Sequence, residues 1–225
     1  MSITRKGCLV EQTEREFVNR EKCIELFKHA IENTRQTTYR VQVYYGVSGV
    51  GKSRLISELQ KVIEEYNLTD QHLPIDWASI NLNTETLMEK GTFLVTLKKE
   101  FQKKYRVKFH FFEIAHSIYW QKSHPEIPLQ KDNYSLFQEL GISMLDISDP
   151  ASSSIISLIL KNIYRASKEF KKFWNSQKEE IRKLAEKDPT YIEENLHLYW
   201  ARDFWNHLQY TSKPAVIFVD TYEAL

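Results

Sequence analysis

Apolar side chains recur along the N-terminal third of the chain with two different periods, one typical of helices and one of strands. Residues 21–33 carry a helical stripe, and residues 52–66 carry a longer one in which apolar positions recur every three or four residues. Between them, residues 39–45 read YRVQVYY, and this aromatic and β-branched run predicts a strand. The strand would end at Gly46, so the pattern predicts the order helix, strand, glycine-rich turn, helix.

Two further strands are expected on either side of a long helical region. Residues 75–82, IDWASINL, predict the second strand of the chain. Residues 216–219 form a continuous apolar run, which is typical of a parallel strand buried on both faces. Helical stripes between these strands predict a mostly helical insertion over residues 90–210.

The helical region has its own start signal, loop and aromatic core. Asp188 followed by Pro189 is typical of a helix N-cap with proline at the first helical position, and this helix should run to about Tyr210. Residues 116–134 contain two prolines and predict a loop. The aromatic side chains are expected to form a core rather than a base-stacking platform. They are Phe109, Phe111, Phe112, Tyr119, Trp120, Phe173, Trp174, Trp200, Phe204 and Trp205.

Composition places the chain among globular proteins and excludes several classes. A chain of 225 residues that is 42% hydrophobic can bury a core. Its 31 basic and 30 acidic residues give a net charge of +1, so no overall field attracts nucleic acid or an anionic membrane. Cys8 and Cys23 lack a metal-binding spacing, and the seven histidines form no i, i+4 zinc pair. Without an apolar signal core or a membrane-spanning run, we expect a cytoplasmic protein.

Residues 46–53, GVSGVGKS, fit the Walker A pattern GxxxxGK[ST]. In this pattern glycines let backbone N–H groups curl around a phosphate, and the next helix adds the partial positive charge of its N-terminus. Lys52 would bridge the outer phosphates, and the Ser53 hydroxyl would bind Mg²⁺. The alternative is a glycine turn with a surface lysine, although a chance match has odds on the order of one in a hundred. The predicted phosphate-binding residues are Gly46, Val47, Ser48, Gly49, Val50, Gly51, Lys52, Ser53 and Arg54.

An acidic motif near the end of the chain is typical of Walker B. Asp220 directly follows the apolar run and would hold Mg²⁺ through water. Glu223 is the candidate to polarise an attacking water, although Thr221 stands where many such enzymes place that acid. With Lys52, these two acids are the candidate catalytic residues. Two alternatives remain: Asp220 is simply a polar residue leaving a strand, or residues 141–149, GISMLDISD, supply the aspartate.

Together the motifs predict an α/β fold, namely the parallel sheet of a P-loop NTPase with a large, mostly helical insertion between Walker A and Walker B. The sheet is incomplete in this prediction because only three strands are identified. We expect one P-loop NTPase domain over residues 1–225. Its parts are an N-terminal segment and helix (1–38), a Walker A core (39–89), the helical insertion (90–212) and the Walker B strand (213–225).

Three segments in order along the chain resemble a known class of ATPases. FVNRE at 17–21, GVSGVGKSRL at 46–55 and VIFVDTYEAL at 216–225 resemble the STAND class, the signal-transduction ATPases with numerous domains, and in particular its bacterial members with an FVGRE-like motif. The resemblance covers nearly the whole chain.

This resemblance implies where the nucleotide base would lie. It assigns contact with adenine to Phe17, Val18 and Arg20. Asn19 stands where the family usually has glycine, and asparagine tolerates a left-handed backbone better than most residues.

The function implied is that of a nucleotide switch that binds ATP or ADP with Mg²⁺, and slow hydrolysis of ATP is expected to reset it. Such a switch acts with a protein partner or further domains and can form a nucleotide-dependent oligomer. A nucleotide or small-molecule kinase is an alternative, although the sequence shows no arginine-rich lid. A non-catalytic, nucleotide-gated interaction module is another. The guanine-reading NKxD motif does not occur, which favours adenine weakly.

Overall fold

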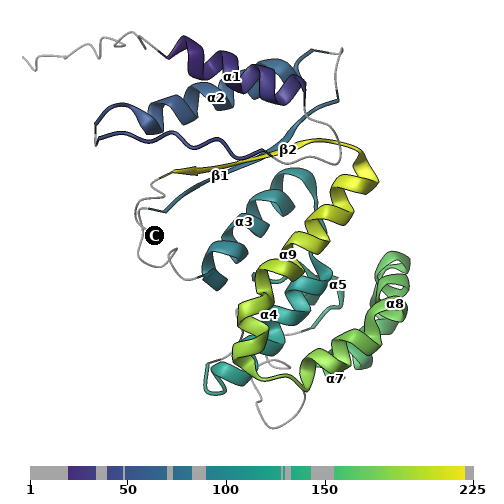
Figure 1. Ribbon diagram of the computed structural model, residues 1–225. Coiled ribbons are helices and arrows are strands. Elements are labelled where there is room, and N and C mark those ends of the chain that lie inside the picture. The colour runs from purple at the N-terminus through teal and green to yellow at the C-terminus, as the bar shows by residue number, and fades with distance from the viewer. Residues whose placement is uncertain are drawn as a thin grey trace, which may run out of the picture.

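The structure is a computed structural model that describes residues 20–33, 40–47, 49–69, 73–82, 90–127, 129, 133–142 and 155–220. Two parallel strands separate a pair of N-terminal helices from a larger group of helices (Figure 1). The elements are α1 (Glu21–Glu32), α2 (Lys52–Asn67), β1 (Asp76–Asn81), α3 (Lys90–Tyr105), α4 (His110–Ser123), α5 (Ser135–Glu139), α7 (Ile155–Asn162), a 3₁₀ turn (Ile163–Arg165), α8 (Lys168–Ala185), α9 (Pro189–Thr211) and β2 (Ala215–Asp220).

The predicted fold class is wrong. Among the described residues only β1 and β2 form a sheet, paired in parallel from Asp76 opposite Ala215 to Asn81 opposite Asp220. The described chain is mostly helical, and a two-stranded sheet is not a P-loop NTPase sheet of three or more strands. The strand predicted at 39–45 accounts for the difference, because residues 40–45 pair with neither β1 nor β2 and residue 39 lies outside the described ranges.

Exposure explains why this segment does not behave as its composition predicts. Val41, Val43 and Tyr45 are 78%, 68% and 91% exposed, while Tyr44 alone packs against the cluster formed by α1 and α2. β-propensity measures how well a side chain fits a pleated, half-buried surface, so it does not create a strand where no neighbouring strand pairs with it. β2 is likewise less enclosed than predicted: Phe218 is buried, but Ile217 is 39% exposed.

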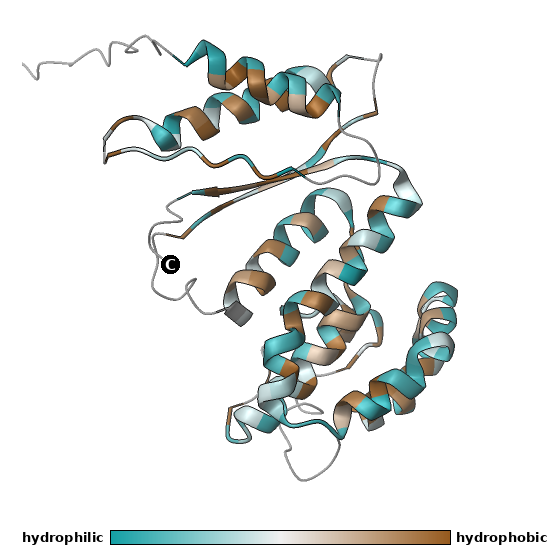
Figure 2. Cartoon of the chain, in the orientation of Figure 1, coloured by the Kyte–Doolittle hydropathy of each residue, from teal (hydrophilic) through white to brown (hydrophobic). Residues whose placement is uncertain are grey.

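The N-terminal helices pack on the sheet through the predicted helical stripes. Phe27 and Ile31 of α1 meet Leu55, Leu59 and Ile63 of α2 in one cluster, which also contains Ile75 and Phe218. These α2 residues are spaced by four, so they lie along one side of the helix. Figure 2 shows the same division, with hydrophobic residues along β2 and on the inner sides of the helices.

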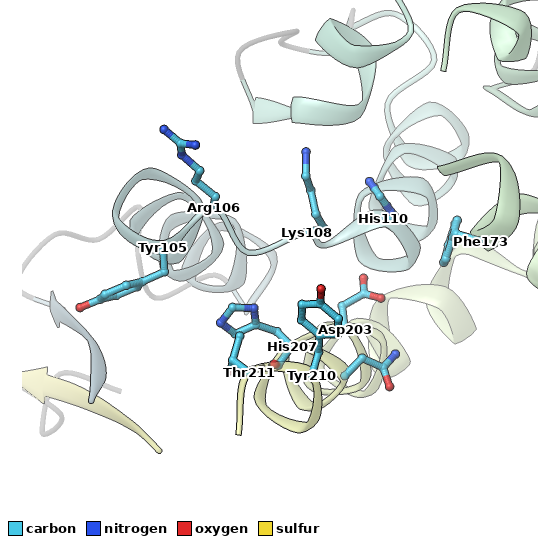
Figure 3. Close-up of a pocket in the computed structure, with 10 residues that line it drawn as sticks. Tyr105, Arg106, Lys108, His110, Phe173, Asp203, His207, Tyr210 and Thr211 are labelled. Atoms are coloured by element: carbon cyan, nitrogen blue, oxygen red, sulfur yellow. Dashed lines mark hydrogen bonds between the residues drawn. The ribbon is translucent and has the colours of Figure 1, made fainter. Parts of the chain in front are cut away.

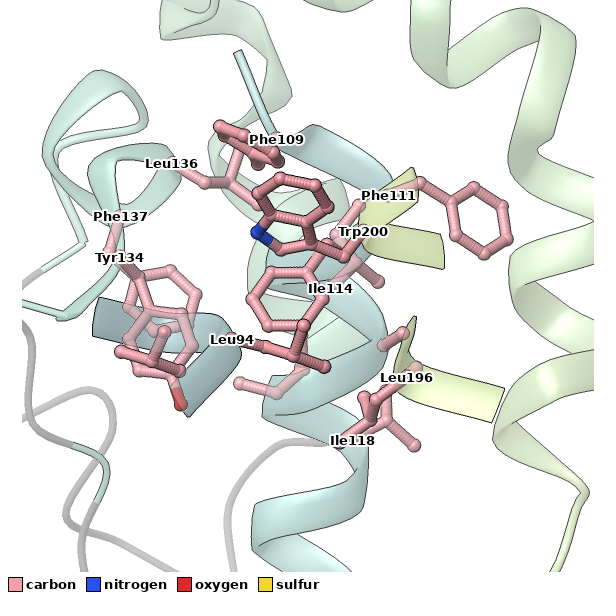
Figure 4. Close-up of a cluster of buried hydrophobic side chains, with 14 of the residues drawn as sticks. Leu94, Phe109, Phe111, Ile114, Ile118, Tyr134, Leu136, Phe137, Leu196 and Trp200 are labelled. Carbon is pink, nitrogen blue, oxygen red and sulfur yellow. The ribbon is translucent and has the colours of Figure 1, made fainter. Parts of the chain in front are cut away.

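The larger cluster lies among the helices on the opposite side of the sheet. Its central part consists of residues from α3, α4 and α9 together with the α5 region (Figure 4). Most of the aromatic residues expected there are buried or half-buried, whereas Trp205 is 48% exposed. The predicted start of α9 is confirmed, since the Asp188 side chain accepts a hydrogen bond from the Thr190 N–H at 2.8 Å and Pro189 begins the helix. The predicted loop at 116–134 is wrong at its start, because α4 continues to Ser123.

A fully buried ion pair joins α3 to α4. Lys98 Nζ lies 2.9 Å from Glu113 Oε1, and the two side chains are 1% and 0% exposed. The carboxylate also accepts hydrogen bonds from Gln102 Nε2, Ser135 Oγ and Leu136 N at 2.8, 3.0 and 2.8 Å. Burial raises the pKa of Glu113, but Lys98 and these hydrogen bonds outweigh it and hold the pKa below its ordinary value. A charge satisfied in this way is tolerated in a core.

Two side chains in the C-terminal half of α9 anchor this helix and position β2. The Asp203 carboxylate accepts a hydrogen bond from Phe112 N at 2.9 Å, at the start of α4. One turn further on, His207 Nε2 lies 3.1 Å from Oδ2 of the buried Asp76 in β1. Because β2 begins four residues after α9 ends, these contacts place β2 beside β1.

Candidate phosphate site

The glycine-rich loop connects the extended segment 40–45 to α2. Gly49 and Gly51 have φ angles of +80° and +86°, a left-handed conformation that residues with a side chain rarely adopt. A Cβ atom added at either position would have no heavy atom within 4 Å, so backbone conformation and not crowding requires glycine there. Gly51 is also the N-cap of α2. The loop therefore turns sharply and leads directly into the helix.

The N-terminus of α2 is electrostatically suited to an anion. Its N-cap is a glycine that provides no side-chain hydrogen bond, and its first turn contains no acidic residue. The first N–H groups of a helix lack partners within the helix, and together with the helix dipole they carry roughly half a positive charge. An oxygen-rich anion such as phosphate is the ligand that such a terminus binds.

Lys52 extends across the loop that precedes it. Its Nζ donates a hydrogen bond to the carbonyl oxygen of Gly46 at 2.8 Å. This contact joins the first and last parts of the Walker A pattern, and it places the ammonium group within the loop region. Ser53 and Arg54 follow in the first turn of α2 and are exposed. Ser48 lies outside the described residues.

One of the three residues assigned to the base is also brought to the loop. Arg20, directly before α1, donates a hydrogen bond from Nη2 to the carbonyl oxygen of Val50 at 2.9 Å. Phe17 and Val18 lie outside the described residues. Arg20 and Val50, which are 30 positions apart, therefore meet in space.

The direction of α2 places its N-terminus toward the carboxyl ends of the strands. Asn67, the last residue of α2, donates from Nδ2 to the Ile75 carbonyl at 2.9 Å and accepts from Ile75 N at 2.7 Å. Ile75 immediately precedes β1, so α2 ends where the parallel strands begin. Its 16 residues span roughly 24 Å, which is comparable to the length of the strands. Figure 1 shows the start of α2 and the arrowhead of β2 at the same end of these layers.

The candidate metal-binding acid lies at that end. Asp220 is the last residue of β2 and is half-buried, and its carbonyl oxygen accepts a hydrogen bond from Leu82 N at 3.1 Å. Asn81 lies opposite it on β1 and was not singled out by sequence reasoning, although its position at the end of a predicted strand indicates the same edge. Glu223 lies outside the described residues. The competing segment 141–149 is described only at residues 141–142, which follow α5 and form no strand.

A cavity of about 450 Å³ lies on the other side of the sheet, between α9, α8 and the connection from α3 to α4 (Figure 3). Sequence reasoning did not predict it, because its walls come from three separate segments of the chain, at residues 105–110, 173 and 203–211. Arg106 and Lys108 are exposed at its edge. Asp203 and His207 also line it, but the first caps α4 and the second contacts Asp76. The polar groups of Asp203 and His207 therefore hold α9 against α4 and β1.

In the described ranges, no group of three or more His, Cys, Asp or Glu side chains is placed to hold a metal ion. Nor does any helix there combine the length and the apolar character needed to cross a bilayer. No protein-family model matches the sequence, and no curated protein or solved structure is significantly similar to it.

Proposed function

We propose that the chain binds the phosphate groups of an Mg²⁺–adenine nucleotide at residues 46–53 and serves as the nucleotide switch of a larger signalling assembly. The observation that carries the proposal is the loop itself. Gly49 and Gly51 are left-handed, the first turn of α2 has no side-chain cap, and Lys52 reaches across to Gly46. These three features give phosphate oxygens backbone donors, a partial positive charge and an ammonium group.

The donor set fits a phosphate with its Mg²⁺. Lys52 would exchange the Gly46 carbonyl for phosphate oxygens, which are stronger, charged acceptors. The Ser53 hydroxyl and the Asp220 carboxylate are oxygen donors of the kind that Mg²⁺ prefers. They belong to the start of α2 and the end of β2, which point to the same end of the molecule. Glu223 is retained as the residue that would polarise a water.

The proposal for the base rests on the N-terminal motif. The resemblance assigns adenine contact to Phe17, Val18 and Arg20, and the hydrogen bond from Arg20 to Val50 supports a position of this motif beside the phosphate loop. ATP and ADP are therefore the proposed ligands, and exchange between them would select between two states of the switch.

A protein partner or further domains form part of the proposal. The apolar side chains of Val41, Val43 and Tyr45 are mostly exposed, and their segment leads into the phosphate loop. A surface of this kind is typical of a region that another part of an assembly covers. We propose that nucleotide state controls this association and the formation of an oligomer.

Titration calorimetry with ATP, ADP and GTP, each with and without Mg²⁺, tests the proposal. The wild-type chain should bind adenine nucleotides at micromolar concentration, and Lys52→Ala should weaken ATP binding at least about tenfold because a charged hydrogen bond to phosphate is lost. Lys61→Ala is the matched control, since Lys61 lies on the same helix, is 62% exposed and pairs with Glu58 at 3.0 Å. It should bind ATP like the wild type. Equal affinity of Lys52→Ala and wild type would contradict the proposal.

A further inference from the structure

Arg20 lies beside the glycine-rich loop at residues 46–53, and its backbone is held in place. Its carbonyl oxygen accepts hydrogen bonds from Cys23 N and Ile24 N at 2.9 and 3.1 Å, so its backbone forms the start of α1. The same helix is held against α2 by the buried Phe27 and Ile31. The Arg20 side chain therefore extends from a packed helix toward the loop that begins α2.

The contact that Arg20 makes is with the backbone of the loop. Nη2 donates to the carbonyl oxygen of Val50 at 2.9 Å, and a hydrogen bond from a charged donor is stronger than one between neutral groups. Val50 is 40% exposed, and its carbonyl belongs to the peptide group that links it to Gly51. That peptide group directly precedes Gly51, the N-cap of α2.

Fixing this carbonyl also fixes the neighbouring N–H group. The structure has no cis peptide bond in the described chain, and in a planar trans peptide the C=O and the following N–H point in opposite directions. The hydrogen bond to Arg20 therefore directs the Gly51 N–H away from Arg20. Gly51 has a φ of +86°, and glycine adopts positive and negative φ with similar ease, so the hydrogen bond from Arg20 adds a contact that favours the observed orientation of this peptide plane.

We infer that Arg20 is a positioning residue for phosphate binding: it orients the Val50–Gly51 peptide so that the Gly51 N–H is available to the phosphates. The inference rests on the proposed function and deepens it. It differs from the adenine contact that the resemblance implies for this arginine. The two roles predict different results with tripolyphosphate, which has the phosphates of ATP but no base.

Affinity measurements separate the two roles. Arg20→Met keeps most of the side-chain length and removes the donors, and it should weaken binding of Mg·ATP and Mg·tripolyphosphate by the same factor, roughly tenfold. Arg20→Lys retains a charge and a donor and should recover part of the loss. Arg182→Met, which removes one charge from the exposed surface of α8, should change neither affinity. Thermal unfolding of each variant checks that the fold is retained.

The nuclear magnetic resonance spectrum of ¹⁵N-glycine-labelled protein tests the positioning without any ligand. The chain has six glycines, so the spectrum is simple. Arg20→Met should shift the assigned Gly51 signal and leave those of Gly91 and Gly141 in place, because the latter two lie in α3 and after α5.

Three results would overturn the inference, and they are distinguishable. An unmoved Gly51 signal would show that Arg20 does not orient this peptide. Loss of ATP affinity with unchanged tripolyphosphate affinity in Arg20→Met would assign the residue to the base. A wild-type chain that binds neither ligand would contradict the proposed function together with the inference.

Discussion

The backbone conformations of single residues decide whether the glycine-rich loop at residues 46–53 can present its N–H groups to a ligand. Gly49 and Gly51 occupy left-handed conformations, and Gly51 is the N-cap of α2. From the Walker A spacing of Gly46, Gly51, Lys52 and Ser53, sequence reasoning predicted a loop whose glycines let backbone N–H groups curl inward, and left-handed glycines suit such a turn. The contact between Arg20 and Val50 had no comparable signal, because nothing in a sequence states which carbonyl an arginine will reach.

Substitution of Gly51 tests the loop at this scale. Gly51→Ala places a Cβ at a φ of +86°, which costs about 1–2 kcal/mol in the free energy of unfolding or forces the loop to change conformation. Either response should also weaken Mg·ATP binding. Urea unfolding and calorimetry measure the two effects.

Gly91→Ala provides the matched control for this substitution. Gly91 is a helical glycine in α3, and an added Cβ would lie an ordinary 3.6 Å from His116 Nε2. This variant should be neutral or slightly more stable, since alanine favours helices. Equal stability and affinity of Gly51→Ala and the wild type would contradict the conformation described for the loop.

At the scale of elements, long-range side-chain contacts set the arrangement of the helices. Asp203 caps the start of α4 from α9, 91 positions away. Burial raises the pKa of this carboxyl group to about 7, and the hydrogen bond from Phe112 N only partly opposes the shift. Burial likewise lowers the pKa of His116 in α4 to about 4, with Lys98 lowering it further.

The two groups act in opposite directions on stability between about pH 4 and pH 7. For Asp203 the folded pKa is above the unfolded one, so its contribution is present at low pH and is lost as pH rises through 7. For His116 the folded pKa is lower, so its contribution is present above pH 6.5 and is lost as pH falls toward 4. In the wild type, the opposite effects of pH on stability from these two groups offset one another.

The variant Asp203→Asn should reveal the dependence of stability on pH that His116 causes. Asparagine keeps an acceptor for Phe112 N but does not titrate, so the stability of this variant should rise with pH across the window. Between pH 4 and pH 7, the free energy of unfolding should change by an amount that differs between this variant and the wild type by at most about 4 kcal/mol. Urea unfolding at a series of pH values measures it. Parallel pH profiles for the two proteins would contradict the role given to Asp203.

Element prediction succeeded where the signal was local and failed where it depended on partners. The stripe at 52–66 and the Asp188–Pro189 start predicted α2 and α9 because spacing and capping are properties of a short segment. The strand at 39–45 was wrong because strand formation requires a pairing neighbour that propensity does not report. In α4, helix packing against α9 extends the helix into a region that its prolines had marked as loop.

At the scale of the whole molecule, the described part of the chain has a two-stranded sheet between two helical clusters in place of the predicted sheet. The candidate site lies at one end of this arrangement, where the phosphate loop begins α2 and Asp220 ends β2 (Figure 1). The start of α2 and the end of β2 lie at the same end because α2 runs opposite to the strands, a direction that the contacts of Asn67 with Ile75 support at the other end. Sequence motifs supplied the candidate residues, whereas the arrangement of the strands around them required the structure.

Hydrogen–deuterium exchange with and without Mg·ATP tests the central claim most directly, because it reports where on the chain the nucleotide acts. If the phosphates bind at residues 46–53, peptides covering 46–55 should exchange more slowly in the presence of Mg·ATP, since their backbone N–H groups become donors to the ligand. Peptides from α8 should be unchanged, and Lys52→Ala should abolish the protection. Unchanged exchange over 46–55 at saturating Mg·ATP, or protection confined to other segments, would contradict the account.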